Sequence, residues 1–458
     1  MTSHLYTRKT RIKAPVEAVF SWHARQGAIS RLTPPWAPLK LLARNRNGIE
    51  KGVRVKFKIR PFGLPMIWKA EHTEYMENRL FKDRQIQGPF AFWEHTHLFD
   101  PDGNSASSMT DQIRFKLPFG ILATPFHRFA EKELDRMFAY RHRVLKYDLE
   151  NHVGRTEKKR ILISGASGTM GSALVPFLQT CGHEVIRLVR KKTDCSPDAL
   201  FWDPSRGLLD LDRAGPIDVV VNLNGADISR GRWTARRKRE IFDSRVIPTR
   251  LLAEKTARLD KKPELFISSS AIGFYGSRGN DCLTETDGYG SLFISRVCQE
   301  WEQAVTPSEK AGIRCVTLRT GVVLTPAGGA LARMALPFRA GLGPVIDQGR
   351  QYMSWISMDD ALSAILHIIA HDSIKGPVNL TAPAPATNRE FSRKLATALA
   401  TRVRLSFPTH MVKRVWGQMG EETLLASARV TPEKLLSTGF RFQHPTLFPA
   451  LQDLLGRP

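Results

Sequence analysis

The chain has 458 residues, of which 42% are hydrophobic, so it is long enough for two or three globular domains. It contains no apolar run long enough to span a bilayer and begins without the apolar segment of a secretory signal, so we expect no membrane span. The five cysteines are scattered and lack C-x-x-C spacing. They predict reduced thiols in a cytoplasmic protein and no metal site.

The formal net charge of +24 invites a nucleic-acid interpretation. The excess is spread along the chain, however, without a long basic tail or a basic-aromatic motif. Its densest cluster, Arg230–Arg239, is interpreted as the start of a helix with a basic solvated face. We therefore expect attraction to anionic cofactors and no specific nucleic-acid partner.

Residues 1–150 combine an early helical segment, Val16–Ile29, with alternating runs and a long amphipathic segment, Pro125–Leu149. Turns such as Asp102-Gly103 separate the alternating runs. The strands expected from this alternation are Leu39–Arg44, Val53–Ile59, Ile67–Tyr75, Leu80–Ile86, Phe90–Phe99 and Met109–Lys116. Helix, antiparallel sheet and closing helix indicate an α+β domain, followed by a polar linker at 151–159.

This first part resembles the helix-grip, START-like domains of the SRPBCC superfamily. The resemblance is carried by Ala14-Pro15-Val16-Glu17-Ala18-Val19-Phe20, Gly88-Pro89-Phe90-x-x-Trp93-x-His95 and Leu117-Pro118-Phe119-Gly120. It implies a curved sheet that wraps the last helix around an apolar cavity for a small apolar ligand. Five aromatic residues either line such a cavity or simply fill a core: Trp36, Phe57, Trp68, Phe90 and Trp93.

Between residues 158 and 400 strand-like and helix-like segments alternate, which predicts a doubly wound parallel sheet of the Rossmann type. The strands are expected at Arg160–Ser164, Glu184–Val189, Val219–Leu223, Leu265–Ser269, Cys315–Arg319 and Gly376–Leu380. The last stretch, 405–455, is expected to form a small, mostly helical C-terminal domain. The predicted domains are thus 1–150, 158–400 and 405–455.

A glycine-rich turn, Gly165-x-x-Gly168-x-x-Gly171, follows the first of these strands and precedes a helix-like segment. Glycines are needed here because the backbone must turn sharply and let a pyrophosphate approach without a Cβ in the way. The helix N-terminus then offers unpaired N–H groups to the phosphates. This order of strand, turn, helix and strand predicts a dinucleotide-binding unit.

The residue after the second strand distinguishes the two nicotinamide cofactors. NAD sites usually carry Asp or Glu there, to accept hydrogen bonds from the ribose 2′-hydroxyl. This chain instead has Arg190-Lys191-Lys192. A guanidinium matches the oxygens of a 2′-phosphate, so the sequence predicts NADP(H) with Arg190 at its phosphate.

Three further strand ends, Asp218–Ala226, Phe266–Gly276 and Leu318–Leu324, carry amides, hydroxyls and glycines. In open α/β sheets, ligands bind outside the carboxyl ends of the strands. We therefore expect these segments to lie beside the glycine-rich turn.

Residues 160–455 resemble the extended short-chain dehydrogenase/reductase superfamily, and within it the epimerase/dehydratase-like subfamily with a small C-terminal domain. Bacterial members with a START-like N-terminal fusion are known. Beyond the segments above, the resemblance is carried by Gly182-His183-Glu184-Val185, Trp202-Asp203-Pro204, Arg232-Trp233-Thr234, Asp243-Ser244-Arg245-Val246, Pro337-Phe338-Arg339, Met353-Ser354-Trp355-Ile356 and Gly439-Phe440.

The resemblance implies a set of cofactor contacts. Arg245 would point into the cleft, and Gly321 and Val322 would lie at the nicotinamide end. The residues that would cradle the pyrophosphate or lie along the cofactor are Gly165, Ser167, Gly168, Thr169, Met170, Leu223, Asn224 and Gly225.

One departure from the superfamily concerns the Tyr-x-x-x-Lys pair, in which lysine lowers the pKa of the tyrosine so that it acts as acid or base. None of the seven tyrosines here is followed four residues later by lysine. If Ser295-Arg296 aligns with the usual Ser-Lys, Leu292 occupies the tyrosine position. The subfamily generally lacks the pair.

Ser270 and Tyr275 remain as candidates to polarise a substrate carbonyl, or they serve only to cap and pack. Arg339 and Trp355 are candidate substrate-pocket residues. The leading hypothesis is an NADP(H)-dependent oxidoreductase that transfers hydride on a small lipophilic carbonyl or alcohol. The alternatives are a non-catalytic NADP(H) sensor coupled to apolar-ligand binding and a sugar-nucleotide epimerase or dehydratase, which suffers most from the lost pair.

Overall fold

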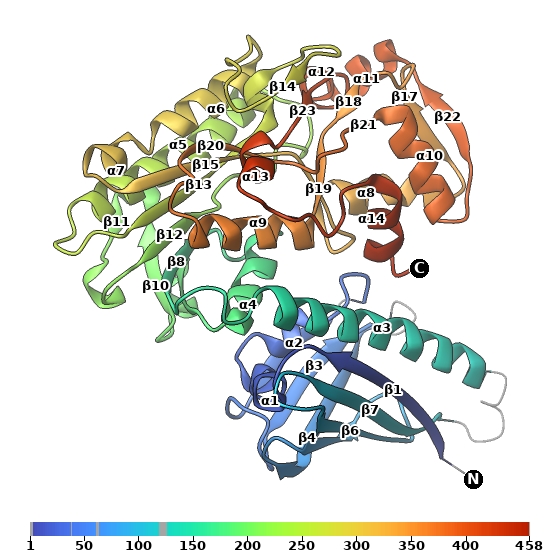
Figure 1. Ribbon diagram of the computed structural model, residues 1–458. Helices are drawn as coiled ribbons and strands as arrows, with labels where there is room; N and C mark the ends of the chain where they lie inside the picture. Colours follow the sequence, from blue (N-terminus) through green and yellow to red (C-terminus); the bar gives the residue numbers. More distant parts are fainter. Residues whose placement is uncertain (1–2, 38, 61–63, 119–125, 458) are drawn as a thin grey trace. The chain divides into compact units, whose positions relative to one another are not determined.

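The computed structural model describes residues 3–37, 39–60, 64–118 and 126–457. The chain divides into two compact units (Figure 1). The first comprises Met1–Glu157 with Pro176–Gly182, and the second comprises Lys158–Val175 with His183–Pro458.

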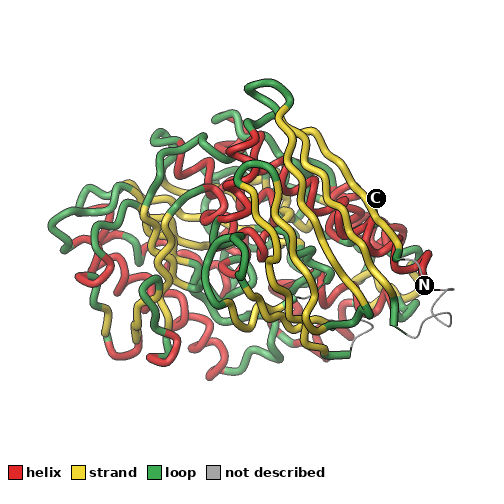
Figure 2. The backbone as a smooth tube through the Cα atoms, turned by 90° about the horizontal axis from the view of Figure 1, so that it is seen from below, coloured by secondary structure: helices red, strands yellow, loops and turns green. Residues whose placement is uncertain are grey.

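The N-terminal unit is built on a seven-stranded antiparallel sheet in the order β1-β7-β6-β5-β4-β3-β2. Figure 2 shows its long strands side by side, next to the N-terminus. The strands are β1 (His4–Ile12), β2 (Lys40–Arg44), β3 (Arg54–Ile59), β4 (Met66–Met76), β5 (Leu80–Gln87), β6 (Phe92–Pro101) and β7 (Ser107–Lys116). The helices are α1 (Val16–Ala24), α2 (Ala28–Arg31) and α3 (His127–Asn151).

The order of these elements agrees with the predicted α+β pattern except that β1, which precedes α1, was not predicted. The six predicted strands form, each with ends shifted by no more than a few residues. The predicted helix Val16–Ile29 is in fact two helices, since Arg25 adopts an extended conformation and ends α1. The predicted closing helix is α3, and the predicted Phe119-Gly120 turn lies outside the described residues.

The five aromatic residues proposed for a cavity do not form one group. Trp68, Phe90 and Trp93 contact one another, with ring centroids 4.7–5.9 Å apart. Phe57 packs on a small cluster around β3 that Trp68 also contacts, whereas Trp36 lies against Tyr140. Trp93 is buried and the other four are half-buried, and a role in lining a cavity stays a prediction.

The second unit contains an eight-stranded sheet in the order β11-β10-β9-β8-β12-β13-β15-β20. All its pairs are parallel except β10 with β11. The strands are β8 (Arg160–Ser164), β9 (Glu184–Val189), β10 (Ala199–Asp203), β11 (Leu208–Leu209), β12 (Val219–Asn222), β13 (Leu265–Ala271), β15 (Arg314–Thr320) and β20 (Gly376–Leu380). The doubly wound Rossmann-like sheet predicted from the alternation is confirmed, and β10 and β11 were not predicted.

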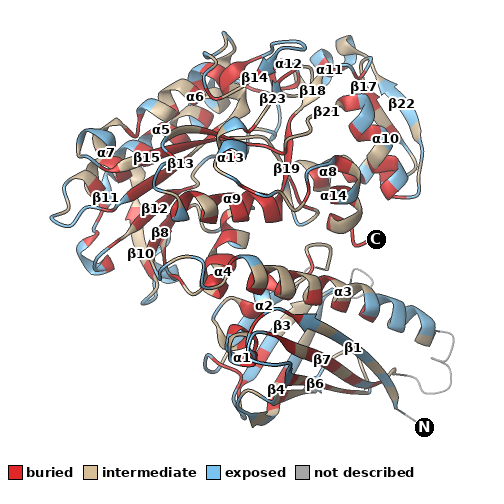
Figure 3. Cartoon of the chain, viewed as in Figure 1, coloured by how far each residue is buried: buried red, intermediate tan, exposed pale blue. Residues whose placement is uncertain are grey.

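Strands of this sheet are apolar because helices cover them. Val219, Val220 and Val221 of β12 are fully buried, and Figure 3 shows β13, β15 and α9 as largely buried. The longer helices of this part are α4 (Gly171–Cys181), α5 (Ala235–Ala257), α6 (Phe293–Gln303) and α9 (Met358–Ala370), with the short α7 (Thr306–Lys310) beside them.

Four small two-stranded pairs complete the second unit. They are β14 (Cys282–Leu283) with β23 (Arg429–Val430), β16 (Val322–Leu324) with β19 (Trp355–Ser357), β17 (Gly343–Ile346) with β22 (Val403–Phe407), and β18 (Tyr352–Met353) with β21 (Ala386–Thr387). The remaining helices are α8 (Gly329–Arg339), α10 (Asn388–Ala398), α11 (Thr409–Trp416), α12 (Gln418–Thr423), α13 (Glu433–Ser437) and α14 (Leu447–Leu454). The C-terminal region is mostly helical, as predicted, but β23 ties it to the loop that carries β14.

Among the described residues, no helix combines the length and the apolar character needed to cross a membrane.

Candidate functional site

Two glycines of the turn between β8 and α4 lie so close to other backbone atoms that a side chain would collide with them. Gly165 has a φ of +75°, and a Cβ there would lie 2.6 Å from the carbonyl oxygen of Leu223. A Cβ on Gly171 would lie 2.3 Å from the carbonyl oxygen of Gly165. The backbone itself therefore requires glycine at both positions.

The outer side of this turn is open and rich in unused donors. Ser167, Gly168 and Thr169 are exposed and Met170 is half-buried. The N–H of Gly168 donates to Gly165, but within the described residues no acceptor takes up the N–H groups of Ser167, Thr169 or Met170. Free N–H groups at the start of an eleven-residue helix form a site suited to a phosphate.

A buried polar ladder fixes the carboxyl ends of the three central strands. Ser164 of β8 donates to Asn222 Oδ1 of β12 at 2.7 Å, and Asn222 Nδ2 donates to Ser268 Oγ of β13 at 3.2 Å. Thr249 on α5 accepts a second hydrogen bond from Asn222 Nδ2. Asn224 donates to Ser164 and Asn222, so the amide predicted to lie along the cofactor is locked in place beside the glycine-rich turn.

Arg190 lies directly after β9 and is exposed. Within the described residues it forms neither a hydrogen bond nor an ion pair, unlike Arg187 on the same strand, which pairs with Asp198. Its charge is therefore available to an anion at the carboxyl end of the sheet. The assignment of that anion as a 2′-phosphate stays a prediction.

Arg245 holds the loop after β12. Its guanidinium donates to the carbonyl oxygens of Ala226 and Ile241 and lies 5.1 Å from the ring centre of Trp301. Burial lowers its pKa to about 10. The guanidinium also lies against Gly225, where a Cβ would come within 3.2 Å of it. In this structure Arg245 thus holds the loop after β12 through backbone hydrogen bonds, and its predicted place in a cofactor cleft stays a prediction.

The two catalytic candidates belong to one buried network. Ser270 donates to Glu302 Oε1 at 2.7 Å, and Tyr275 donates its hydroxyl proton to Asn379 Oδ1 at 2.6 Å. Arg319 links them, since it forms a two-pronged ion pair with Glu302 and donates to the Tyr275 oxygen at 3.0 Å.

This network leaves neither hydroxyl free. Tyr275 is fully buried, and this burial raises the pKa of its phenol to about 12 despite the nearby Arg319. The phenol therefore stays protonated at neutral pH, and no lysine lowers its pKa as in a Tyr-x-x-x-Lys pair. Both hydroxyls make structural contacts, and a catalytic role for Ser270 or Tyr275 stays a prediction.

The remaining predicted site residues, Gly321, Val322, Trp355 and Arg339, differ in how far they are exposed to solvent. A Cβ on Gly321 would come within 2.7 Å of the Ser354 carbonyl oxygen, to which the Val322 N–H donates. Trp355 is fully buried in a core cluster, and its indole donates to the Ala384 carbonyl oxygen. Arg339 ends α8 and is exposed. The structure thus gives Trp355 a packing role, and a place in a substrate pocket stays a prediction for both residues.

An ion pair near the glycine-rich turn was not predicted. Arg333 of α8 donates to Asp227 Oδ2 at 2.6 Å and also contacts Ser229, which joins α8 to the loop after β12. Just before α8, a Cβ on Gly328 would lie 3.2 Å from Thr169 Oγ1. The loop after β12 and the segment before α8 thus both border the glycine-rich turn. The sequence spacing of these residues gives no sign that the two segments meet.

The second unit matches known proteins along most of its length. Residues 161–380 match the NAD dependent epimerase/dehydratase family, and residues 407–454 match a domain of unknown function, DUF1731. An "Epimerase family protein" of Mycobacterium leprae is 39% identical over 303 residues, which cover 66% of this chain and 98% of that relative.

Two crystal structures extend the comparison. A human epimerase family protein, crystallised with NADPH, is 31% identical, covers 65% of this chain and 99% of its own, and gives a TM-score of 0.60. A protein of Corynebacterium glutamicum, described as a nucleoside-diphosphate sugar epimerase, is 32% identical with a TM-score of 0.80. The match covers 98% of this chain and 90% of that protein, so it includes both units.

Proposed function

The chain belongs to the NAD dependent epimerase/dehydratase family, and from this premise we propose that it is an NADP(H)-dependent oxidoreductase acting on a small lipophilic carbonyl or alcohol. The observation that carries the proposal is the pairing of a phosphate cradle with an unpaired arginine. Among the residues that the structure describes, the N–H groups of Ser167, Thr169 and Met170 have no acceptor at the start of α4, and Arg190 has no partner at the end of β9.

The residues present fit NADP(H) on chemical grounds. The closely packed glycines let the pyrophosphate approach the backbone, and Arg190 supplies a positive charge where an NAD site would carry a carboxylate. The NADPH in the human relative supports the same choice. The residues that would hold the cofactor are Gly165, Ser167, Gly168, Thr169, Met170, Arg190, Leu223, Asn224, Gly225, Gly321 and Val322.

The bound nicotinamide would supply the hydride, and the protein would position and shield it. Asn224 would orient the cofactor, because Ser164 and Asn222 already fix its amide. Reduction of a carbonyl also needs a proton. Tyr275 is protonated at neutral pH but donates to Asn379, so proton delivery requires that this hydrogen bond opens or that water supplies the proton.

A second candidate function draws support from that same network. If Ser270 and Tyr275 stay engaged, the chain binds NADP(H) without turning it over and acts as a sensor of the cofactor's redox state. In that case the N-terminal unit, an antiparallel sheet with a closing helix, would bind an apolar ligand whose affinity depends on the cofactor.

A third candidate is sugar-nucleotide epimerisation, which is supported by the description of the Corynebacterium relative. Such a reaction begins by oxidising the sugar, which requires a base with a lowered pKa. Burial has the opposite effect on the pKa of Tyr275. If Ser295-Arg296 aligns with the usual Ser-Lys, Leu292 occupies the position of the usual tyrosine. This chemistry therefore ranks behind the first two.

Hydride transfer separates these functions. The full chain would be incubated with NADPH carrying deuterium at C4 of the nicotinamide and with a panel of lipophilic aldehydes and ketones, and the products would be analysed by mass spectrometry. The oxidoreductase proposal expects deuterium on the carbonyl carbon of at least one product. Tight NADPH binding without any deuterated product would favour the sensor, and turnover of a nucleotide sugar would favour epimerisation.

A further inference from the structure

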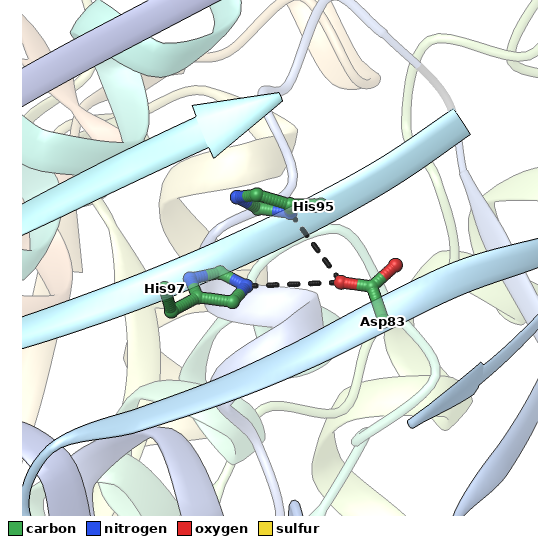
Figure 4. A group of neighbouring side chains, drawn as sticks. All are labelled: Asp83, His95 and His97. Atoms are coloured by element: carbon green, nitrogen blue, oxygen red, sulfur yellow. Dashed lines mark ion pairs between the residues drawn. The ribbon is translucent and has the colours of Figure 1, made fainter. Parts of the chain in front are cut away.

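The N-terminal sheet carries two histidines and two aspartates on neighbouring strands. His95 and His97 alternate along β6 on its buried side, between Trp93 and Phe99. The strand register places Asp83 of β5 opposite His95, and Asp111 of β7 opposite His97. Figure 4 shows one nitrogen of each imidazole facing the same carboxylate oxygen of Asp83.

The separations between these groups fit a metal ion better than hydrogen bonds. Asp83 Oδ2 lies 3.4 Å from His95 Nδ1 and 3.8 Å from His97 Nε2. The three ligand atoms all lie within 4.8 Å of one another. Good hydrogen bonds to nitrogen span about 2.7–3.2 Å, whereas ligands about 2.1 Å from a tetrahedral ion are about 3.4 Å apart.

Asp111 prepares the two imidazoles for this role. It contacts the opposite nitrogen of each ring, His95 Nε2 at 3.0 Å and His97 Nδ1 at 2.7 Å, although the second contact lacks hydrogen-bond geometry. A carboxylate that holds the far N–H of an imidazole leaves the near nitrogen as a lone pair, which is the usual arrangement around metal-binding histidines. The free nitrogens of His95 and His97 then face Asp83.

The burial and the charge of these side chains also favour a bound metal ion. The side chains of His95 and His97 are 5% and 11% exposed, and those of Asp83 and Asp111 are 18% and 2% exposed. Buried carboxylates are costly unless hydrogen bonds or cations compensate them. His142 Nε2 already contacts Asp111 Oδ2 at 2.7 Å, and a divalent ion would supply a positive charge beside Asp83. Within the described part of the chain, His97 Nδ1 is also a buried polar atom without a hydrogen-bond partner.

We propose that Asp83, His95 and His97 bind one divalent transition metal ion of the zinc class, with Asp111 as the carboxylate that orients the imidazoles. Two nitrogen ligands and one carboxylate suit Zn²⁺, Co²⁺ or Fe²⁺, whereas Mg²⁺ and Ca²⁺ prefer oxygen ligands alone. Three protein ligands leave a coordination position for water or for a polar group of a ligand.

This site was missed in the sequence, from which we expected no metal. Its ligands come from two strands and lack the Cys/His spacing of zinc motifs, so only the pairing of β5 with β6 brings them together. The site is independent of NADP(H) binding in the second unit, and its failure would leave the proposed function unchanged.

The test is titration calorimetry of the full chain, stripped of metal with a chelator, with Zn²⁺ and then with Co²⁺ as a visible-absorption probe. We expect one equivalent bound tightly and a Co²⁺ spectrum typical of nitrogen and oxygen ligands. Asp83→Asn, His95→Gln and His97→Gln should each weaken binding at least about 100-fold, and Asp111→Asn about 10–100-fold. His410→Gln, at an exposed position, serves as the control.

Far-UV circular dichroism and a cooperative thermal unfolding transition would show that each variant is folded. Anomalous X-ray scattering from wild-type crystals grown with Zn²⁺ gives a second measurement that needs no variant. An anomalous peak between Asp83, His95 and His97 is the expected result. No saturable binding, a peak elsewhere, or variants that bind like the wild type would overturn the proposal and leave the histidines only as partners of the buried aspartates.

Discussion

Arg319 and Glu302 form a two-pronged ion pair, in which the guanidinium Nε and Nη2 each donate to one carboxylate oxygen at 3.0 Å. The side chains are only 5% and 15% exposed. The pair connects the end of β15 with α6, and it holds Ser270 on one side and Tyr275 on the other. The site around the catalytic candidates therefore depends on two residues that the sequence did not single out.

Removal of Arg319 should be strongly destabilising, because Glu302 would remain as a buried carboxylate without its partner. We expect Arg319→Met to lower the free energy of unfolding by about 3–5 kcal/mol. The measurement is urea denaturation followed by circular dichroism. Arg206→Met, at an arginine that is 78% exposed, is the control and should change stability by less than about 0.5 kcal/mol. Equal stability of the two variants would contradict a structural role for the ion pair.

Tyr275→Phe distinguishes a structural role of the Tyr275 hydroxyl from a catalytic one. The substitution leaves Asn379 Oδ1 and an Arg319 N–H without their buried partner, so we expect a loss of about 1–3 kcal/mol in the free energy of unfolding. NADPH affinity should stay within about twofold, as determined by fluorescence titration. A loss of turnover with unchanged stability would instead show that the phenol acts on substrate.

Gly171→Ala tests the geometry of the turn. The new Cβ would lie 2.3 Å from the Gly165 carbonyl oxygen, so the turn must open and the cradle for the pyrophosphate is lost. NADPH binding should fall at least about 100-fold, which corresponds to about 2.7 kcal/mol. Gly288→Ala is the matched control, since a Cβ there meets nothing within 4 Å. Unchanged binding by the Gly171 variant would contradict the proposed phosphate site.

Much of the second unit was predictable because its signals are local. Three features lie within single segments: the run of Val219–Val221, the glycines of the turn and Arg190 after β9. The contacts of Tyr275 were not predictable, because its partner Asn379 belongs to β20, more than 100 residues further along the chain. The same holds for Asp83 and His95, which meet only through strand register. Two-stranded pairs such as β17 with β22 were not predicted, because each strand is short and its partner lies far along the chain.

The stability of the protein should fall as the pH rises from neutral to alkaline, in part through His444. Burial alone would lower the pKa of His444, but its contacts with Asp360 and Asp453 overcome burial and raise the pKa from 6.5 to about 9. A raised pKa in the folded state means that the stabilisation is complete below pH 6.5 and is lost as the pH rises through about 9.

The wild type should therefore lose up to about 3 kcal/mol more than His444→Gln between these two pH values. Guanidinium denaturation of both proteins at several pH values measures this difference. Parallel pH profiles for the two proteins would show that His444 carries no such linkage.

The central claim, an NADP(H) site formed by the glycine-rich turn and Arg190, is tested most directly by calorimetric titration of the full chain with NADPH and with NADH. The account predicts tight NADPH binding, NADH binding at least about tenfold weaker, and loss of this preference in Arg190→Ala but not in Arg206→Ala. Equal affinity for the two cofactors, or a preference that survives Arg190→Ala, would contradict the assignment of Arg190. No binding of either cofactor would contradict the site itself.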